Sequence, residues 1–337
     1  MKAKTLFGVL GGAALVGTTA AAIGAKTLFD RVIPRQDTLR VDLNEMADMQ
    51  KWEEYKKIIT PRKEWLMKQP LEQIDIKARD GIGLRGWYLP ADKPTDRLVI
   101  GLHGYTSSGL SNFSPHSYFF HQLGFDCLIV DARAHGESGG KYIGFGVLDR
   151  FDCLAWINYV EKRFGGEKRI ILHGTSMGAT TALMTLGFSS LPNSVKGVIS
   201  DCAFTSPYDV FVHILKRDYH LPPFPIMQFN SILCKSKAGY SFDEYSTLTA
   251  LKQTDRPVLF IHGAEDNFVP VPMSFENAEA CRSPHELLIV EGAGHGASYY
   301  ENMYLYEYTE WSFIEKYIGN GEEVTEYSFR STQNDLL

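Results

Sequence analysis

The chain has 337 residues, of which 44% are hydrophobic and 22% are charged, and its net charge is −6. These values are those of an ordinary globular protein, which excludes extensive disorder and a fibrous structure. The sequence has no run rich in lysine or arginine, so we expect no nucleic acid partner.

The chain begins with a segment that is uncharged from Thr5 to Ala25, about the length that a helix needs to cross a bilayer. An uncleaved anchor, a cleaved signal peptide and a buried helix all fit residues 1–26. Basic residues are more numerous after this segment than before it, which favours a cytoplasmic side for the rest of the chain. We therefore expect a membrane-associated protein, which would be secreted if the segment were cleaved.

Residues 27–72 have apolar side chains at helical spacing among charged ones. We interpret them as a helical linker of one or two amphipathic helices, broken at Pro61. Packing of this linker on the core is favoured over a membrane-surface role, because its polar face is not strongly basic.

A series of strand-like segments starts near residue 73. The alternating segments 73–79 and 84–89 flank Asp80-Gly81 and predict an edge hairpin. Continuous apolar runs, typical of strands covered on both faces, follow at 98–102, 127–130, 169–173, 194–200, 258–261 and 286–290. Helical patterns lie between them, notably Val147–Phe164. Residues 73–318 therefore predict an α/β domain whose mostly parallel central sheet has helices on both faces.

A glycine-flanked serine interrupts this pattern at Gly174-Thr-Ser-Met-Gly178. An apolar strand precedes it and a run of small, helix-compatible residues follows it. A sharp strand–serine–helix turn is the context of a nucleophile elbow, in which the serine hydroxyl projects above the sheet. We predict that Ser176 is a nucleophile; a plain turn is the alternative.

A serine nucleophile needs a base, and the base needs an acid that orients it. His295 lies in the glycine-rich loop after the last predicted strand, and Asp266 follows the strand before it. We predict His295 as the base and Asp266 as the acid; Glu265 and Asp201 are the alternative acids. The order serine, aspartate, histidine is that of the α/β-hydrolase triad.

The loop after the strand 98–102 begins with His103-Gly-Tyr105. We predict that the backbone N–H groups of Tyr105 and Met177 form an oxyanion hole, and that His103 shapes the loop. The five cysteines form no C-x-x-C pair, which favours a reduced compartment without a disulfide framework. No H-E-x-x-H motif is present, and we expect neither a metal nor a cofactor.

Together with Asp131–Ser138, these motifs make residues 74–318 similar to the α/β-hydrolase family. The branch that they resemble contains monoglyceride lipases and serine aminopeptidases. The resemblance implies a structural role for Asp131–Ser138, in which Ala134 replaces the usual glycine. A hydrophobic segment before such a domain resembles the membrane-tethered bacterial members.

A long insertion, at about 202–251, follows the sixth predicted strand. It predicts two short helices, at 208–216 and 226–237, rich in aromatic and aliphatic residues. We expect a cap that shields an acyl-enzyme from water and favours apolar acyl groups; plain core packing is the alternative. The polar tail 319–337 is expected to be loosely ordered.

The sequence thus predicts a serine hydrolase of the carboxylesterase or lipase kind. It would cleave a small-molecule ester with an apolar acyl group through an acyl-enzyme, without a cofactor. The alternatives are a thioesterase or peptidase with the same triad, and a catalytically silent member of the fold that binds a ligand or protein.

Overall fold

The computed structural model describes residues 21–36 and 49–319. Most of the predicted segment 1–26, part of the predicted linker and nearly all of the tail 319–337 lie outside these ranges. Within the two described ranges, no helix is both long and apolar enough to cross a membrane.

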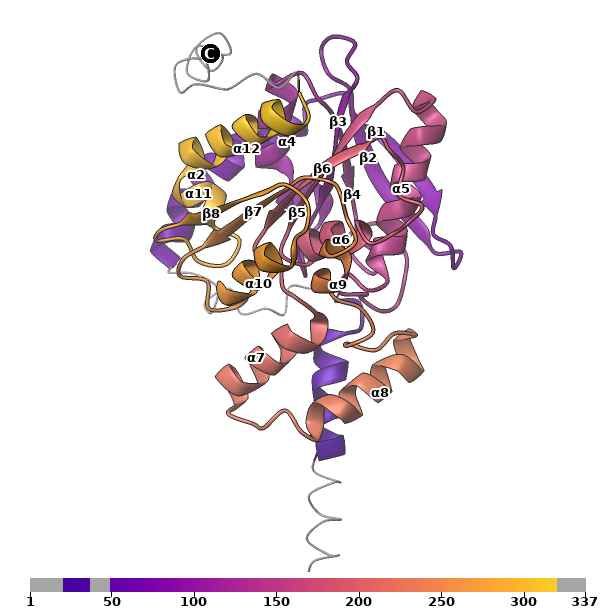
Figure 1. Cartoon of the computed structure of the whole chain (residues 1–337), viewed down its shortest axis with the longest axis vertical. Helices are drawn as coiled ribbons and strands as arrows, with labels where there is room; N and C mark the ends of the chain where they lie inside the picture. Colours follow the sequence, from indigo (N-terminus) through magenta and orange to yellow (C-terminus); the bar gives the residue numbers. More distant parts are fainter. Residues whose placement is uncertain (1–20, 37–48, 320–337) are drawn as a thin grey trace, which may run out of the picture.

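A central sheet of eight strands organises the chain, in the order β1-β2-β4-β3-β5-β6-β7-β8 (Figure 1). The strands are β1 (Glu72–Lys77), β2 (Gly83–Leu89), β3 (Arg97–Leu102), β4 (Asp126–Val130), β5 (Arg169–Thr175), β6 (Val195–Asp201), β7 (Val258–Gly263) and β8 (His285–Val290). β1 and β2 form the predicted antiparallel edge hairpin, and β2 also pairs antiparallel with β4. All other pairs are parallel, which confirms the predicted sheet.

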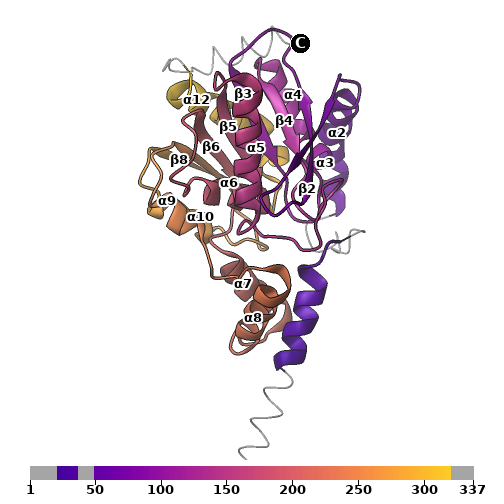
Figure 2. The same ribbon diagram turned by 90° about the vertical axis from the view of Figure 1, so that its right-hand side faces the viewer.

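Helices cover both faces of the sheet, as the continuous apolar runs predicted. Successive strand residues alternate between the faces, so Ile171 and Leu172 belong to different core clusters. One face carries α2 (Met49–Leu66), α4 (Ser114–Gln122), α11 (Ser298–Glu301) and α12 (Met303–Tyr317); the other carries α5 (Asp149–Phe164), α6 (Met177–Thr185), α9 (Thr247–Leu251) and α10 (Pro272–Ala280) (Figure 2). A short helix, α3 (Gly109–Asn112), lies in the loop after β3.

The predicted break at Pro61 is wrong, because α2 is one helix from Met49 to Leu66 with Pro61 inside it. A proline removes one helical hydrogen bond, so other contacts must hold the helix. Arg62 forms an ion pair of 3.0 Å with the buried Glu307 of α12, and Leu66 is fully buried. Tertiary packing therefore overrides the local preference for a break.

The cap lies beyond the carboxyl ends of the strands, where Figures 1 and 2 show it projecting from the sheet. It consists of α7 (Pro207–Tyr219) and α8 (Ile226–Ala238), which follow β6 and confirm the two helices predicted there. Residues 21–32 form a helix that packs in one apolar cluster with both cap helices. The helix 21–32 therefore belongs to the cap region of the folded domain.

Candidate active site

The nucleophile elbow lies between β5 and α6. Ser176 has φ 55° and ψ −114°, a strained conformation for a residue with a side chain. The neighbouring glycines allow the close approach that this turn requires. A Cβ on Gly178 would lie 2.1 Å from the carbonyl oxygen of Leu102, and one on Gly174 would lie 2.4 Å from the backbone of Gly178. The Ser176 N–H donates to the carbonyl of Asp201 on the adjacent strand, over 2.7 Å.

Three predicted site residues meet at the carboxyl edge of the sheet. His295 Nε2 lies 2.9 Å from Ser176 Oγ, and His295 Nδ1 lies 2.7 Å from Asp266 Oδ2. All three side chains are buried. Because a carboxylate can only accept, Nδ1 carries the proton, and the lone pair of Nε2 faces the serine hydroxyl. This is the arrangement in which an imidazole can take the serine proton.

Asp266 is held as a carboxylate by its surroundings. Its Oδ1 accepts hydrogen bonds from the N–H groups of Phe268 and Val269, each over 2.9 Å. Burial acts to raise the pKa of Asp266, but the charges and hydrogen bonds of His295 and His262 outweigh it and hold that pKa below its usual range. Asp266 therefore stays ionised and can stabilise a positive charge on His295.

His262 is a second histidine on this carboxylate, and the sequence analysis missed it. Its Nε2 lies 2.8 Å from the carbonyl oxygen of Val269 and 3.1 Å from Asp266 Oδ2, while its Nδ1 lies 2.6 Å from Ser274 Oγ. Burial acts to lower the pKa of His262, but Asp266 raises it above the usual value. Its position at the end of β7, four residues before Asp266, is the sequence signal that points to this contact.

The two alternative acids lie elsewhere. Glu265 is exposed to solvent. The Asp201 carboxylate is buried but accepts hydrogen bonds from Ser298 Oγ at 3.3 Å and Tyr306 OH at 3.2 Å. Of the three acids considered, Asp266 is the one hydrogen-bonded to His295.

The loop after β3 runs beside the serine. A Cβ on Gly104 would lie 3.6 Å from Ser176 Cβ. His103 holds this loop through backbone groups, since its Nδ1 donates to Gly104 O over 2.7 Å and its Nε2 accepts from the Ala132 N–H over 3.0 Å. Met177 is the first residue of α6, so its N–H is one of the donors that a helix start leaves without a helical partner. Tyr105 borders the same pocket as Ser176.

The segment Asp131–Ser138 supports that loop from the neighbouring strand. The Asp131 carboxylate accepts the Gly109 N–H over 2.7 Å, and His135 Nε2 accepts the Thr106 N–H over 3.3 Å. Ala134 has φ 58°, a left-handed conformation that explains why glycine is usual there.

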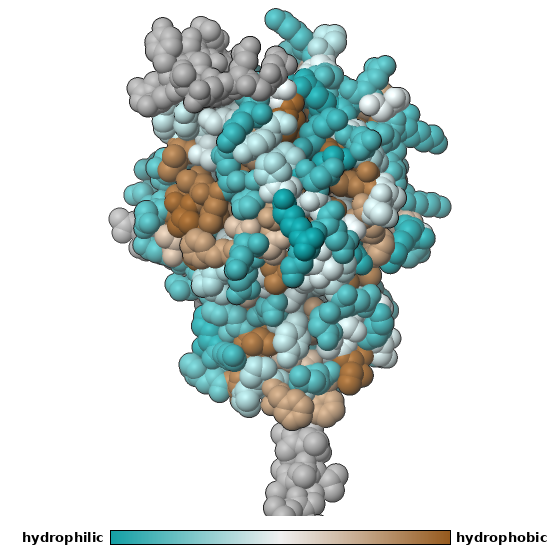
Figure 3. All heavy atoms as spheres, viewed as in Figure 1, coloured by the Kyte–Doolittle hydropathy of each residue, from teal (hydrophilic) through white to brown (hydrophobic). Residues whose placement is uncertain are grey.

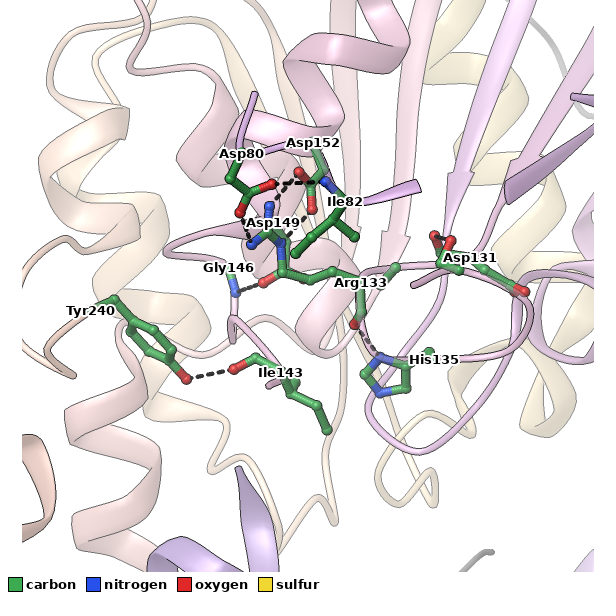
Figure 4. Close-up of polar contacts among 12 residues, drawn as sticks. Asp80, Ile82, Asp131, Arg133, His135, Ile143, Gly146, Asp149, Asp152 and Tyr240 are labelled. Atoms are coloured by element: carbon green, nitrogen blue, oxygen red, sulfur yellow. Dashed lines mark hydrogen bonds and ion pairs between the residues drawn. The ribbon is translucent and has the colours of Figure 1, made fainter. Parts of the chain in front are cut away.

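Arg133 anchors the same segment to the body of the domain. Figure 4 shows its guanidinium between Asp152 and Asp80, at 2.6 and 2.9 Å. Asp149 lies beside this group and accepts the Gly146 N–H. The buried ion pair of Arg133 and Asp152 therefore ties α5 to the loop network below the active site.

A pocket of about 310 Å³ opens at Ser176. Its walls come from the body, the cap helix α7 and the helix 21–32. The lining is mainly apolar, with Leu28, Val32, Tyr105, Phe145, Phe204, Val210, Phe211, Ile214 and Phe268. Such a pocket suits an apolar substrate group placed next to the serine.

Two groups of buried side chains in the described ranges have residue types that can bind a metal ion. One is Cys202 with Asp266 and His295, and it uses the two side chains that already contact each other and Ser176. The other is His116, His173 and Glu310, in which His173 Nε2 and Glu310 Oε1 are joined over 2.7 Å and the two imidazole rings pack 4.4 Å apart. The first group is thus part of the contacts around Ser176. In the second group, His116 Nδ1, His173 Nδ1 and Glu310 Oε2 have no hydrogen-bond partner among the described residues.

Residues 111–321 match the prolyl oligopeptidase family. This match spans more than half of the chain and includes Ser176, Asp266 and His295. The chain belongs to this family. It is also 30% identical to the YqkD protein of Bacillus subtilis over 251 residues, which are 74% of this chain and 80% of that protein.

Solved structures of the α/β-hydrolase fold are similar to this family member. An esterase of Pyrococcus furiosus matches with a TM-score of 0.62 and 24% identity, over 76% of this chain and 94% of that one. An acylaminoacyl peptidase of Pyrococcus horikoshii matches with a TM-score of 0.57 and 17% identity, over 80% of this chain and 45% of that one. These comparisons support a serine hydrolase of the α/β-hydrolase fold. The narrower resemblance to monoglyceride lipases and serine aminopeptidases stays a prediction.

Proposed function

We propose that this serine hydrolase cleaves carboxylic esters through an acyl-enzyme. The observation that carries the proposal is the chain of contacts from Ser176 through His295 to Asp266, at 2.9 and 2.7 Å, which opens into a mainly apolar pocket. The proposed partner is a small-molecule ester whose apolar acyl group lies among the aromatic side chains of the pocket.

In the proposed reaction, Ser176 Oγ attacks the ester carbonyl carbon while its proton passes to His295 Nε2. The N–H groups of Tyr105 and Met177 bind the resulting oxyanion. The C–O bond then breaks, and the alcohol leaves with the proton from His295. Water, which loses a proton to His295, attacks the acyl carbon and releases the acid, and that proton returns to Ser176. Asp266 stays ionised throughout.

A peptidase with the same catalytic residues is the second candidate, because the chain belongs to the prolyl oligopeptidase family. The two candidates share every step except the leaving group, which is an amine in peptide hydrolysis. A panel of p-nitrophenyl esters and peptide p-nitroanilides separates them. We expect kcat/KM to be higher for the esters and to rise with acyl length until the pocket is filled.

We also propose that the chain is membrane-associated through its N-terminal segment. The uncharged stretch from Thr5 to Ala25 supports this, and the excess of basic residues after it favours a cytoplasmic catalytic domain.

Labelling of the full chain with a fluorophosphonate tests the nucleophile. We expect one adduct, on Ser176, and no adduct or ester turnover in a folded Ser176→Ala variant. A folded wild-type protein without an adduct would instead support a binding protein that has lost catalysis.

A further inference from the structure

The helix 21–32 forms part of the wall of the active-site pocket. Leu28 and Val32 line the same cavity as Ser176, with Phe211 and Ile214 of α7 on the cap side. The hydroxyl of Tyr105 donates to the carbonyl of Val32 over 3.1 Å. The helix 21–32 is therefore in direct contact with the loop beside Ser176.

This helix is built into the fold. Three of its side chains at i, i+4 spacing, Ala21, Ala25 and Phe29, are buried in the cluster that includes α7 and α8, and Ile33 directly after the helix belongs to the same cluster. Beyond the helix, the Arg35 N–H donates to Lys141 O over 2.9 Å and the Ile143 N–H donates to Ile33 O over 2.8 Å. Cleavage near Ala25 would remove part of this packed face, so an uncleaved segment fits the structure better than a signal peptide.

Apolar side chains are exposed on the same part of the molecule. Most of the large apolar side chains that the described residues expose lie on the helix 21–32, on α8, and at the end of α7 and the connection after it. They are Phe224 (72% exposed), Ile232 (66%), Ile23 (63%), Tyr219 and Leu221. Figures 1 and 2 show these elements projecting together from the sheet, and Figure 3 shows apolar surface at that end as well as on the body. Exposed apolar side chains gathered in this way mark an interaction surface.

Positive charge accompanies these side chains. A second cavity, of about 320 Å³, lies between the helix 21–32 and α8 and is lined by Lys26, Lys141 and Lys237. Its remaining lining includes Asp30, which pairs with Lys26, and the apolar side chains of Phe29, Tyr142 and Leu233. Lysines beside apolar groups match the anionic headgroups and acyl chains of a lipid surface.

The sequence before the helix 21–32 indicates what this apolar and basic surface contacts. The stretch from Thr5 to Ala25 has no charged residue, and the helix that it enters starts at the cap end of the molecule. The part of this stretch that precedes the described helix, residues 5–20, is uncharged, as suits the apolar core of a bilayer. Ile23 and Lys26 lie on the helix that this stretch enters. Ile232 and Lys237 lie on α8, and Lys141 lies in the loop between β4 and α5.

We propose that the helix 21–32, the α7–α8 connection and α8 form a surface that docks on an anionic lipid bilayer. We call it the cap surface. Docking brings the pocket wall formed by Leu28 and Val32 to the membrane, so that the enzyme takes its acyl substrate directly from the bilayer. The substrate part of this inference rests on the proposed ester hydrolysis.

A direct test of docking uses the full chain in vesicles of phosphatidylcholine with phosphatidylglycerol. The five native cysteines are buried, so a cysteine introduced at the surface takes a thiol-reactive fluorophore selectively. We expect nitroxide-labelled lipids to quench the fluorophore on Phe224→Cys and on Ile232→Cys. Phe275→Cys, on the exposed part of α10, is the matched control and should keep its emission. Equal quenching at all three positions, or none at 224 and 232, would overturn the docking proposal.

A second test follows substrate entry. We expect the double variant Phe224→Asp with Ile232→Asp to hydrolyse a long-chain ester embedded in the vesicles at least tenfold more slowly than the wild type. Hydrolysis of a short water-soluble ester should be unchanged, and Phe275→Asp should behave as the wild type on both substrates. Unchanged hydrolysis of the embedded ester by the double variant would refute entry from the bilayer. If the wild type turns over neither ester, the proposed function fails, while the quenching result still decides docking.

Discussion

The substitution Asp266→Asn tests the site most sharply, because the structure determines how the new amide must lie. Oδ1 of Asp266 accepts two backbone N–H groups, so the oxygen of an asparagine has to stay there. The NH2 group then replaces Oδ2 and faces Nδ1 of His295, 2.7 Å away. To accept a hydrogen bond from this NH2 group, His295 must carry its proton on Nε2 instead of Nδ1. Nε2 then has no free lone pair, so His295 can no longer act as a base towards Ser176.

The expected loss follows from this change of tautomer. In serine hydrolases with the same arrangement, such a change lowers kcat by about 10⁴-fold, which corresponds to about 5.5 kcal/mol of transition-state stabilisation. The assay is kcat/KM for a p-nitrophenyl ester, with the rate of fluorophosphonate labelling as a second readout that does not depend on turnover.

Asp201→Asn is the matched control. Its carboxylate accepts from Ser298 and Tyr306, and an asparagine oxygen can still accept one of these bonds. We expect its kcat/KM to stay within about threefold of the wild type, since its carboxylate hydrogen bonds go to Ser298 and Tyr306 and not to His295. A loss of less than about tenfold in a folded Asp266→Asn variant would refute the assignment of the acid. An equal loss of kcat/KM in Asp266→Asn and Asp201→Asn would also refute this assignment.

Three further predictions concern stability, and urea unfolding measures each of them. Gly178→Ala is expected to lower the free energy of unfolding by about 3 kcal/mol or more, because its Cβ would lie 2.1 Å from a backbone oxygen of β3. An unchanged unfolding midpoint would contradict this. Arg133→Leu should lower the free energy of unfolding by about 3–5 kcal/mol, because it leaves Asp152 charged and buried. Arg163→Leu removes a more exposed ion pair and should lower it by no more than about 1 kcal/mol. Equal losses of stability in the two variants would argue against a buried-charge effect. Because the pKa of Asp266 is lowered in the folded state, its ionisation stabilises the fold above about pH 4, and this stabilisation is lost as the pH falls further. Asp266→Asn should therefore make the free energy of unfolding fall less steeply below pH 4. An unchanged pH dependence would contradict this role of Asp266.

The sheet could be predicted from the sequence because its strands are unambiguous. Runs such as 98–102 and 258–261 are apolar on both faces, and only a strand between two helical layers buries them completely. The positions of Ser176, Asp266 and His295 follow from the same topology, since the carboxyl ends of parallel strands meet at one edge. The order of the three residues in the sequence then leaves few ways to assign the roles of nucleophile, acid and base.

Other features depend on tertiary contacts that local patterns do not encode. The contact of His262 with Asp266 exists because the turn after β7 brings the chain back to the end of that strand. The helix through Pro61 persists because Arg62 and Leu66 are held by the body. The place of residues 21–32 was open for a further reason: an uncharged stretch of alanine and glycine looks alike whether protein or lipid surrounds it.

The helix 21–32 also affects how this chain relates to its family. The match to the prolyl oligopeptidase family covers residues 111–321, which include all three residues of the proposed triad but not Leu28 or Val32. The catalytic centre and one wall of its pocket thus come from regions of the sequence that can change separately. Substitutions in the helix 21–32 can alter which substrates fit the pocket without changing Ser176, Asp266 or His295. Substrate preference in this protein therefore cannot be transferred from relatives that lack the helix, however well their catalytic residues align.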